Sequence, residues 1–300
     1  MPTLSLVARV APPLAVRAAT GPRAARVPPA GATRRLRQEL RQAAEANGFT
    51  LLFQPRRALA NGALLGAEAS LRWPRGRGGA ISGGLVTHLE SLGVAGPVVA
   101  WVLREACRAA ALWPFGLLSV AVPGSSLVDG TLLGDVGAAL ALSGLSPERL
   151  EVALAEPALG TESTEALLTL AALRDLGVGV ALDGFGAESA SLLTLKRLPL
   201  TTLKVDRSLV RDLPDDREAG AVVAAATFFA RALDVSVVAC GVETEAQRGL
   251  LRRIGCDAAQ GSLFGRPVAD LGEAGVMGSD FSGLTSSRGR HEICRRTEII

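Results

Sequence analysis

The middle of the chain alternates short, almost continuously apolar runs with longer segments of helical periodicity. In the runs Val178–Leu182 and Val235–Ala239, nearly every position is apolar. A strand with one face in water would alternate apolar and polar residues, so these runs are typical of parallel strands buried on both faces. The pattern therefore predicts an α/β fold in which helices cover a parallel sheet.

The predicted elements alternate regularly between strand and helix. Strands are expected at Phe49–Gln54, Ala63–Trp73, Leu117–Pro123, Leu150–Glu156, Val178–Phe185, Thr202–Asp206 and Val235–Val242. Helices are expected at Pro97–Trp113, Ser163–Leu176, Asp215–Leu233 and Glu245–Ile254, with two more that end near Gly144 and at Arg197. Repeated strand–helix units in one domain favour a closed (β/α) barrel over an open doubly wound sheet. No glycine-rich dinucleotide fingerprint follows the first strand, which also argues against the open sheet.

The two ends of the chain differ in composition from the middle. Residues 1–35 contain many arginines, alanines and prolines but no acidic residue, because Glu39 is the first. We expect residues 1–35 to be a disordered basic leader, or to precede the true start of the protein. Residues 36–270 are expected to form the barrel domain. Residues 271–300, which are rich in glycine, serine and arginine, are expected to be a disordered tail.

Charge and cysteine usage narrow the classes of partner and location. The formal net charge of +3 is too small to indicate a DNA or RNA partner. No apolar run approaches the ~20 residues of a membrane-spanning helix, so no membrane segment is expected. The cysteines Cys107, Cys240, Cys256 and Cys294 form neither a CxxC pair nor a metal-binding spacing. This usage predicts a reducing, cytoplasmic location.

Carboxylates occur where the apolar runs stop. Glu156, Asp183, Asp206 and Glu243 each end or follow a predicted strand, and Glu68 lies inside the second strand. The active sites of (β/α) barrels lie at the C-terminal ends of the strands. Buried carboxylates must meet a cation, hydrogen-bond donors or a ligand, so acids on separate strands of one barrel predict a shared site.

Six strings resemble the signatures of EAL domains, in the family's order and spacing from about Leu36 to Val268. They are Phe53–Pro55 (FQP), Glu68–Trp73 (EASLRW), Leu182–Gly186 (LDGFG), Leu203–Ser208 (LKVDRS), Gly241–Thr244 (GVET) and Gln260–Pro267 (QGSLFGRP). The resemblance implies a modified TIM (β/α)8 barrel whose first strand runs antiparallel to the others. It also implies cyclic di-GMP as the substrate, which the family cleaves to linear pGpG with two divalent metal ions.

Compared with the family, only part of the metal-binding set is retained. The resemblance assigns Glu68, Asp183 and Asp206 to metal binding. The asparagine and glutamate ligands that the family carries on intervening strands are replaced here by Ala121 and Ala153. The resemblance therefore implies that two oxygen ligands of the paired metal ions have been lost.

Two further replacements affect the bridging acids and the base. Gly184 stands where the family has the second of two adjacent aspartates, and Cys240 where it has the glutamate proposed as general base. Loss of a general base typically lowers a rate ~10²–10⁴-fold. A lone buried cysteine is usually a small apolar residue, so Cys240 is not expected to rebuild a metal site. We expect a catalytically inactive or strongly impaired domain that requires no cofactor, with only weak residual Mg²⁺ or Mn²⁺ binding.

Most residues that face the ligand in the family are retained. By resemblance, these are Gln54, Arg72, Glu156, Asp183, Lys204, Glu243 and Gln260. Arg72 and Lys204 would contact phosphates, the former as a bidentate fork. The alternative for Lys204 is an ion pair with Asp183 or Asp206 that braces the core.

Three functions follow from these observations. The first is a non-catalytic receptor or regulator that binds cyclic di-GMP. The second is a protein-interaction module that binds no nucleotide and docks a protein partner through its helices, with Val222–Leu233 as a candidate face. The third is a residual metal-dependent phosphodiesterase that produces pGpG. Homodimerisation, which is common in the family, stays open because the sequence reveals no interface.

Overall fold

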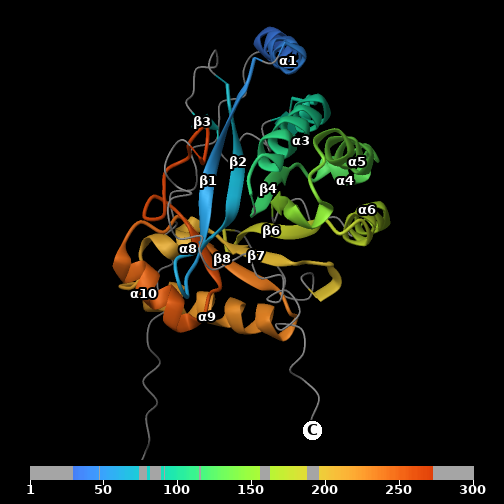
Figure 1. Ribbon diagram of the computed structural model, residues 1–300. Coiled ribbons are helices and arrows are strands. Elements are labelled where there is room, and N and C mark those ends of the chain that lie inside the picture. Colours follow the sequence, from blue (N-terminus) through green and yellow to red (C-terminus); the bar gives the residue numbers. More distant parts are fainter. Residues whose placement is uncertain are drawn as a thin grey trace, which may run out of the picture.

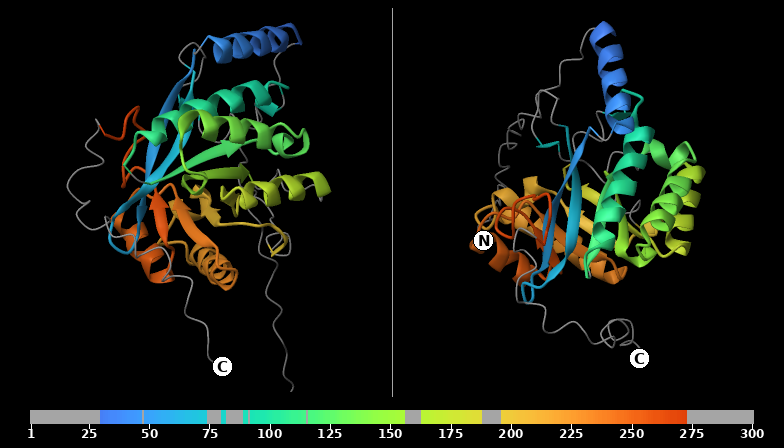
Figure 2. Two further views of the ribbon diagram at one scale, coloured as in Figure 1. Left: turned by 45° about the vertical axis from the view of Figure 1, so that its right-hand side comes forward. Right: turned by 45° about the horizontal axis from the view of Figure 1, so that its top comes forward.

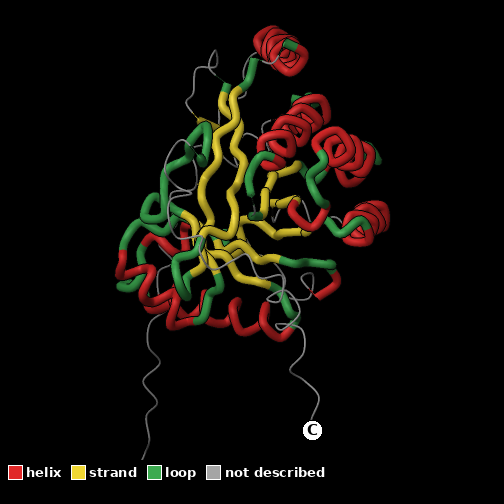
Figure 3. Tube along the Cα trace, in the orientation of Figure 1, coloured by secondary structure: helices red, strands yellow, loops and turns green. Residues whose placement is uncertain are grey.

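The strands of the computed structural model form one continuous sheet that closes into a barrel (Figures 1 and 3). The structure describes residues 30–46, 48–73, 80–81, 89–90, 92–114, 116–155, 163–187 and 196–272. Its strands are β1 (Thr50–Ala58), β2 (Leu64–Arg72), β3 (Ala80–Ile81), β4 (Leu117–Val122), β5 (Leu150–Ala155), β6 (Gly179–Phe185), β7 (Thr202–Val205), β8 (Ser236–Cys240) and β9 (Ala258–Gln260). They follow the order β1-β9-β8-β7-β6-β5-β4-β2-β3, and a pairing of β1 with β2 closes the ring.

Strand β1 runs against the other strands of the ring. It is antiparallel to both of its neighbours, β2 and β9. The strands β2, β4, β5, β6, β7, β8 and β9 are parallel to one another in sequence around the barrel. Strand β3 pairs with β2 at the margin of the ring. The predicted modified TIM barrel with an antiparallel first strand is therefore confirmed.

Helices pack on the outside of the ring (Figure 2). They are α1 (Ala30–Glu45), α3 (Ala95–Ala111), α4 (Ser125–Val128), α5 (Leu132–Ser143), α6 (Thr164–Asp175), α8 (Arg207–Arg211), α9 (Arg217–Ala232) and α10 (Glu245–Ile254), with a 3-10 turn at Pro147–Arg149. Helix α3 contacts α1, α5 and β4, whereas α9 contacts α8, α10 and β8. In Figure 1 these two groups cover different sides of the barrel.

The parallel strands have one face toward the helices and one face inside the ring. In β4, Leu118, Val120 and Val122 are almost completely buried in the hydrophobic core that also contains residues of α3. Ser119 lies between them and donates a hydrogen bond to Glu151 of β5 inside the barrel. Both faces of such a strand are buried, which explains the nearly continuous apolar runs of the sequence.

Side chains cap the starts of several helices. Ser163 caps α6, Asp216 caps α9, and Thr244 forms a reciprocal capping box with Gln247 at the start of α10. Such caps satisfy backbone N–H groups that would otherwise lack a partner in the first turn. The caps also fix the end of each preceding loop. One of these loops, between β8 and α10, carries Glu243.

Most observed elements lie within a few residues of the predicted ones, but some were not predicted. Strand β9 consists of Ala258, Ala259 and Gln260, which is too short and too poor in β-branched residues to be recognised from its sequence. Helix α8 was also missed, because it is short and follows directly on β7. Helix α1 crosses position 35, where the leader was expected to end, and buries Leu40 and Ala44.

Several expectations fall on residues that the structure does not describe. Residues 1–29 and 273–300, which hold most of the expected leader and tail, lie outside the described residues. So do residues 156–162, including Glu156, and residues 188–195 of the helix expected to end at Arg197. Of the helices in the described ranges, none has the length and apolar character needed to cross a membrane.

Candidate ligand site inside the barrel

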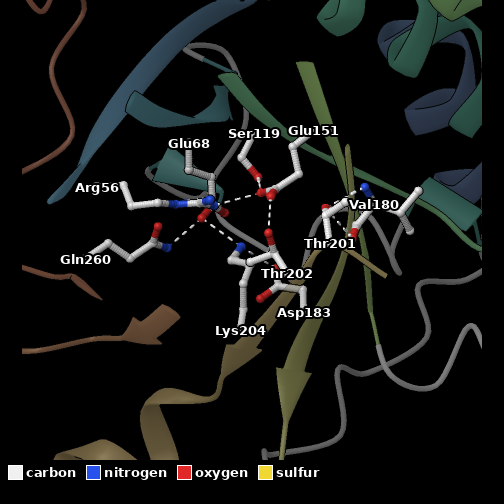
Figure 4. A network of polar contacts seen from close by, with 10 residues as sticks. All are labelled: Arg56, Glu68, Ser119, Glu151, Val180, Asp183, Thr201, Thr202, Lys204 and Gln260. Atoms are coloured by element: carbon white, nitrogen blue, oxygen red, sulfur yellow. Dashed lines mark hydrogen bonds and ion pairs between the residues drawn. The ribbon is translucent and has the colours of Figure 1, made fainter. Parts of the chain in front are cut away.

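A buried lysine lies between two carboxylates inside the barrel (Figure 4). Lys204 of β7 is 1% exposed, and its Nζ lies 2.9 Å from Oε2 of Glu68 and 3.0 Å from Oδ2 of Asp183. Gln260 of β9 donates a hydrogen bond through Nε2 to the same Oε2 of Glu68. We call Lys204, Glu68, Asp183 and Gln260 the lysine site. Its members come from β7, β2, β6 and β9, so closure of the barrel is required to assemble it.

The three charged groups of the lysine site, Lys204, Glu68 and Asp183, shift one another's pKa values. Burial would lower the pKa of Lys204, but the Asp183 and Glu68 carboxylates outweigh burial and raise this pKa above its ordinary value. Burial acts to raise the pKa of Glu68, yet Lys204, the hydrogen bond from Gln260 and the charge of Arg56 together lower it. For Asp183 burial prevails over the attraction of Lys204, and its pKa is raised. Lys204 is therefore a cation held between the Asp183 and Glu68 carboxylates.

A second polar cluster lies beside the lysine site, within the same ring of strands. Glu151 of β5 is 1% exposed and lies 2.9 Å from Nη2 of Arg56. Its carboxylate also accepts hydrogen bonds from Oγ of Ser119 at 2.8 Å and from Oγ1 of Thr202 at 2.6 Å. Burial acts to raise the pKa of Glu151, but the Arg56 charge and these donors lower it. We call Glu151, Arg56, Ser119 and Thr202 the Glu151 cluster.

Sequence reasoning did not find the Glu151 cluster. The sequence did contain a hint of it, because Glu151 is a charged residue within an otherwise apolar strand. Arg56 is likewise a charged residue within a strand, β1. Which of the many charged residues these two would meet could not be read from the sequence. Arg56 and Glu151 are far apart in the chain, and the pair forms only when the sheet closes.

Cys240 ends β8 and lies opposite Gln260 in the adjacent strand. Burial raises the pKa of its thiol, and Lys204 opposes this effect only partly. Only the thiolate is an effective nucleophile or metal ligand, so Cys240 is neutral and unreactive at physiological pH.

The alanines expected at lost ligand positions form a band of small side chains. Ala121 of β4 lies opposite Ala153 of β5, and Ala153 lies opposite Ala181 of β6. Ala121 and Ala153 follow Ser119 and Glu151 by two residues, so they share the inner face of the sheet. Gly184 follows Asp183 with a φ of +80°, and a Cβ at this position would meet open space. None of these three side chains supplies an oxygen ligand.

The remaining expected site residues lie at varying distances from Lys204. Nε2 of Gln54 donates a 3.4 Å hydrogen bond to the carbonyl oxygen of Gly265. Arg72 is exposed at the end of β2, while Glu243 is 55% exposed and lies 3.8 Å from Arg207. Glu156 lies outside the described residues.

The carboxylates assigned to residual metal binding are not all brought together. Glu68 and Asp183 share Lys204, whereas Asp206 accepts a 2.8 Å hydrogen bond from the backbone N–H of Ser208 and caps α8. The alternative expectation of an ion pair between Lys204 and Asp183 is confirmed. Within the described ranges, no group of three or more histidine, cysteine, aspartate or glutamate side chains is placed to hold a metal ion.

A closed barrel with one antiparallel strand and inward-facing Glu68, Asp183 and Lys204 defines the class to which the chain belongs. The family model of the EAL domain matches residues 37–267. The chain is therefore a member of the EAL domain family.

Two curated relatives come from Pseudomonas aeruginosa. The bifunctional diguanylate cyclase/cyclic di-GMP phosphodiesterase MucR is 37% identical over 239 residues, which cover 78% of this chain and 35% of MucR. The cyclic di-GMP phosphodiesterase NbdA is 37% identical over 239 residues, which cover 78% of this chain and 30% of NbdA. The chain thus spans about a third of the length of the curated relatives it matches.

Solved structures of EAL domains with bound nucleotide share the fold. The complex of the MucR phosphodiesterase with c-di-GMP has a TM-score of 0.73 and 35% identity, covering 80% of this chain and 99% of that one. The FimX EAL domain from Pseudomonas aeruginosa bound to c-di-GMP has a TM-score of 0.70 and 26% identity, covering 77% and 96%.

The Lys204→Met substitution tests whether the ammonium holds the site together. Removing one partner of a buried ion pair leaves uncompensated charge, so we expect a loss of about 3–5 kcal/mol in the free energy of unfolding at pH 7. Without Lys204, burial and the neighbouring Glu68 charge raise the pKa of Asp183 further, so the folded variant binds more protons than the unfolded one. Its stability should therefore rise as the pH falls from 7 to 5. Urea denaturation at both pH values measures this change.

The matched control is Lys196→Met, which replaces the exposed lysine and should change the stability by less than about 0.5 kcal/mol. In the wild-type protein the pKa of Lys204 is raised, so its contribution is complete below the unfolded value of about 10.4 and is lost only at higher pH. A Lys204→Met protein as stable as the wild type at pH 7 would show that the ammonium does not hold the site together.

Proposed function

We propose that this chain is a receptor for cyclic di-GMP that hydrolyses the nucleotide slowly or not at all. The observation that carries the proposal is the position of Lys204 Nζ, within 3.0 Å of the two inward carboxylates Glu68 and Asp183. These carboxylates are assigned to metal binding by the resemblance, and here both are already paired with a fixed cation.

The residues that surround Lys204 do not fit two divalent ions. Mg²⁺ prefers six oxygen ligands, and a two-metal site holds its ions about 3.5–4 Å apart. Ala121 and Ala153 carry no oxygen, and Asp206 is committed to the cap of α8. A divalent ion at Glu68 and Asp183 would also have to displace a buried ammonium from both carboxylates.

The general-base position supports the same conclusion. Cys240 is the residue at that position. The raised pKa of its thiol keeps it protonated near neutral pH, so it cannot accept a proton from the attacking water. A base must have a pKa near the operating pH to be effective. We therefore expect slow turnover, because the described residues supply neither a paired-metal site nor a base.

Nucleotide binding depends on residues other than those that are lost. Arg56 and Lys204 offset two of the three interior carboxylates, which are Glu68, Asp183 and Glu151. This internal neutralisation lowers the repulsion of a dianionic ligand without a metal ion. Arg72, exposed at the end of β2, is placed to add a guanidinium fork for a phosphate.

The comparisons support the same ligand for this chain. The MucR phosphodiesterase and the FimX EAL domain are described with c-di-GMP bound, and both share the barrel over more than three quarters of this chain. The retained residues Gln54 and Gln260 lie on β1 and β9, which close the barrel.

Calorimetric titration of cyclic di-GMP into the protein with EDTA tests the proposal. We expect micromolar or tighter binding that Mn²⁺ does not improve, and no pGpG by chromatography after incubation with Mn²⁺. Arg72→Gln should weaken binding roughly 10- to 100-fold, because a charge-assisted phosphate contact contributes roughly 1.5–3 kcal/mol. Flat heats both with EDTA and with Mn²⁺ would exclude a nucleotide receptor and leave a barrel retained for protein contacts.

Restoring the replaced residues tests why turnover is absent. We expect the fourfold variant Ala121→Asn/Ala153→Glu/Gly184→Asp/Cys240→Glu to release pGpG with Mn²⁺ at least about 100-fold faster than the wild type, since a base alone supplies that much. The same variant with Glu68→Ala added is the matched control and should be inactive. Wild-type protein that already turns over as fast as the fourfold variant would show that the replacements do not impair catalysis.

A further inference from the structure

Both oxygens of the Glu151 carboxylate accept hydrogen bonds. Oε1 accepts from Arg56 Nη2 and Ser119 Oγ, and Oε2 accepts from Thr202 Oγ1. The charge of Glu151 is matched by one guanidinium, and both residues are at least nine-tenths buried. A buried carboxylate with this many partners has one well-defined position.

These bonds cross the interior of the barrel. Ser119 lies on β4, which is a neighbour of β5, but Arg56 and Thr202 lie on β1 and β7, which are not. Figure 4 shows the Arg56 side chain reaching from its strand into the centre of the barrel, where Glu151 and Glu68 are both close. Glu151 therefore joins strands that have no backbone hydrogen bonds with one another.

The Glu151 cluster and the lysine site lie side by side, on the shared strand β7 and on pairs of neighbouring strands. Thr202 precedes Lys204 by two residues on β7, and Ser119 lies opposite Glu68 between β4 and β2. Arg56 lies opposite Gln260 between β1 and β9. The Arg56 charge also lowers the pKa of Glu68, which shows that the guanidinium lies within electrostatic reach of that carboxylate.

Arg56 has an unused hydrogen-bond donor, so its guanidinium could pair with a carboxylate other than Glu151. Its Nε is buried without a hydrogen-bond partner, and the Oε1 atom of Gln260 is in the same condition. A buried guanidinium that loses its carboxylate partner must find another anion, because an uncompensated buried charge is costly. Glu68 is the carboxylate within reach, and it is held at present by Lys204 and Gln260.

We propose that Glu151 is a positioning residue, which holds the Arg56 guanidinium away from Glu68 and so reserves Glu68 for Lys204 and Gln260. For nucleotide affinity, this inference depends on the proposed receptor function; for the geometry of Lys204, it does not. Neutralising Glu151 frees Arg56 to pair with Glu68, which displaces Lys204 and disturbs the surface that receives the ligand.

The experiment uses the fact that Lys196 and Lys204 are the only lysines of the chain. Protein labelled with ¹³C and ¹⁵N in lysine gives two side-chain ammonium signals, of which Lys196 is the exposed reference. In Glu151→Gln, we expect the Lys204 signal to shift and its ammonium protons to exchange faster with water, while the Lys196 signal stays unchanged. Cyclic di-GMP affinity should fall about tenfold, as is usual when a supporting residue is lost.

Two further variants separate positioning from general stability. Ser119→Ala removes a neutral donor from Glu151 but leaves Arg56 paired, so the protein should melt at a lower temperature with an unchanged Lys204 signal. Adding Arg56→Leu to Glu151→Gln removes the freed cation, and the Lys204 signal should return to its wild-type position. If Glu151→Gln fails to fold, Glu151→Asp withdraws the carboxylate from Arg56 and should give a smaller shift in the same direction.

The outcomes distinguish this inference from the proposed function. A folded Glu151→Gln or Glu151→Asp protein with unchanged Lys204 signal and unchanged affinity overturns the positioning role and leaves the receptor proposal intact. A shifted Lys204 signal in a protein whose wild type binds no cyclic di-GMP supports the positioning role and overturns the receptor. A shift that Arg56→Leu does not reverse also contradicts the inference, because the freed guanidinium would not be its cause.

Discussion

The ammonium group of Lys204, buried between Glu68 and Asp183, is the interaction on which the interior of the barrel depends. A buried charge is tolerated only where opposite charges and donors meet it closely. Lys204 meets this condition with partners on two other strands, and Gln260 adds a donor from a third. The complete site forms only when the barrel closes, because Glu68 of β2 and Lys204 of β7 lie on strands that are not neighbours, whereas Asp183 lies on β6, beside β7.

The polar interior has two parts with different consequences for function. The Glu151 cluster is enclosed, its carboxylate accepts three hydrogen bonds, and it ties β5 to β1, β4 and β7. The lysine site is more accessible, since the side chains of Glu68 and Asp183 are 18% and 26% exposed. A ligand that enters the barrel therefore meets a site whose charges are already balanced internally. In an EAL domain that carries alanines at two expected ligand positions, this balance is the basis of the proposed nucleotide receptor.

Much of the fold could be predicted from the sequence, because a strand buried on both faces leaves an apolar run that needs no tertiary information to recognise. Strand β9 could not, since Ala258–Gln260 has no such run and becomes a strand only through its pairing with β1 and β8. The site shows the same division. Strand-end acids and the EAL signatures predicted Glu68, Asp183 and Lys204 as neighbours, whereas the cross-barrel pair of Arg56 and Glu151 depends on register and closure, which one sequence does not display.

Lys204 already occupies the carboxylates that a divalent ion would need. The most direct test is to titrate Mn²⁺ into lysine-labelled protein and follow the Lys204 side-chain signal, with Lys196 as the reference. We expect excess Mn²⁺ to leave the Lys204 signal in place with its intensity intact, because the paramagnetic ion does not enter the lysine site. Selective broadening of Lys204 at low Mn²⁺, with Lys196 unaffected, would contradict this expectation.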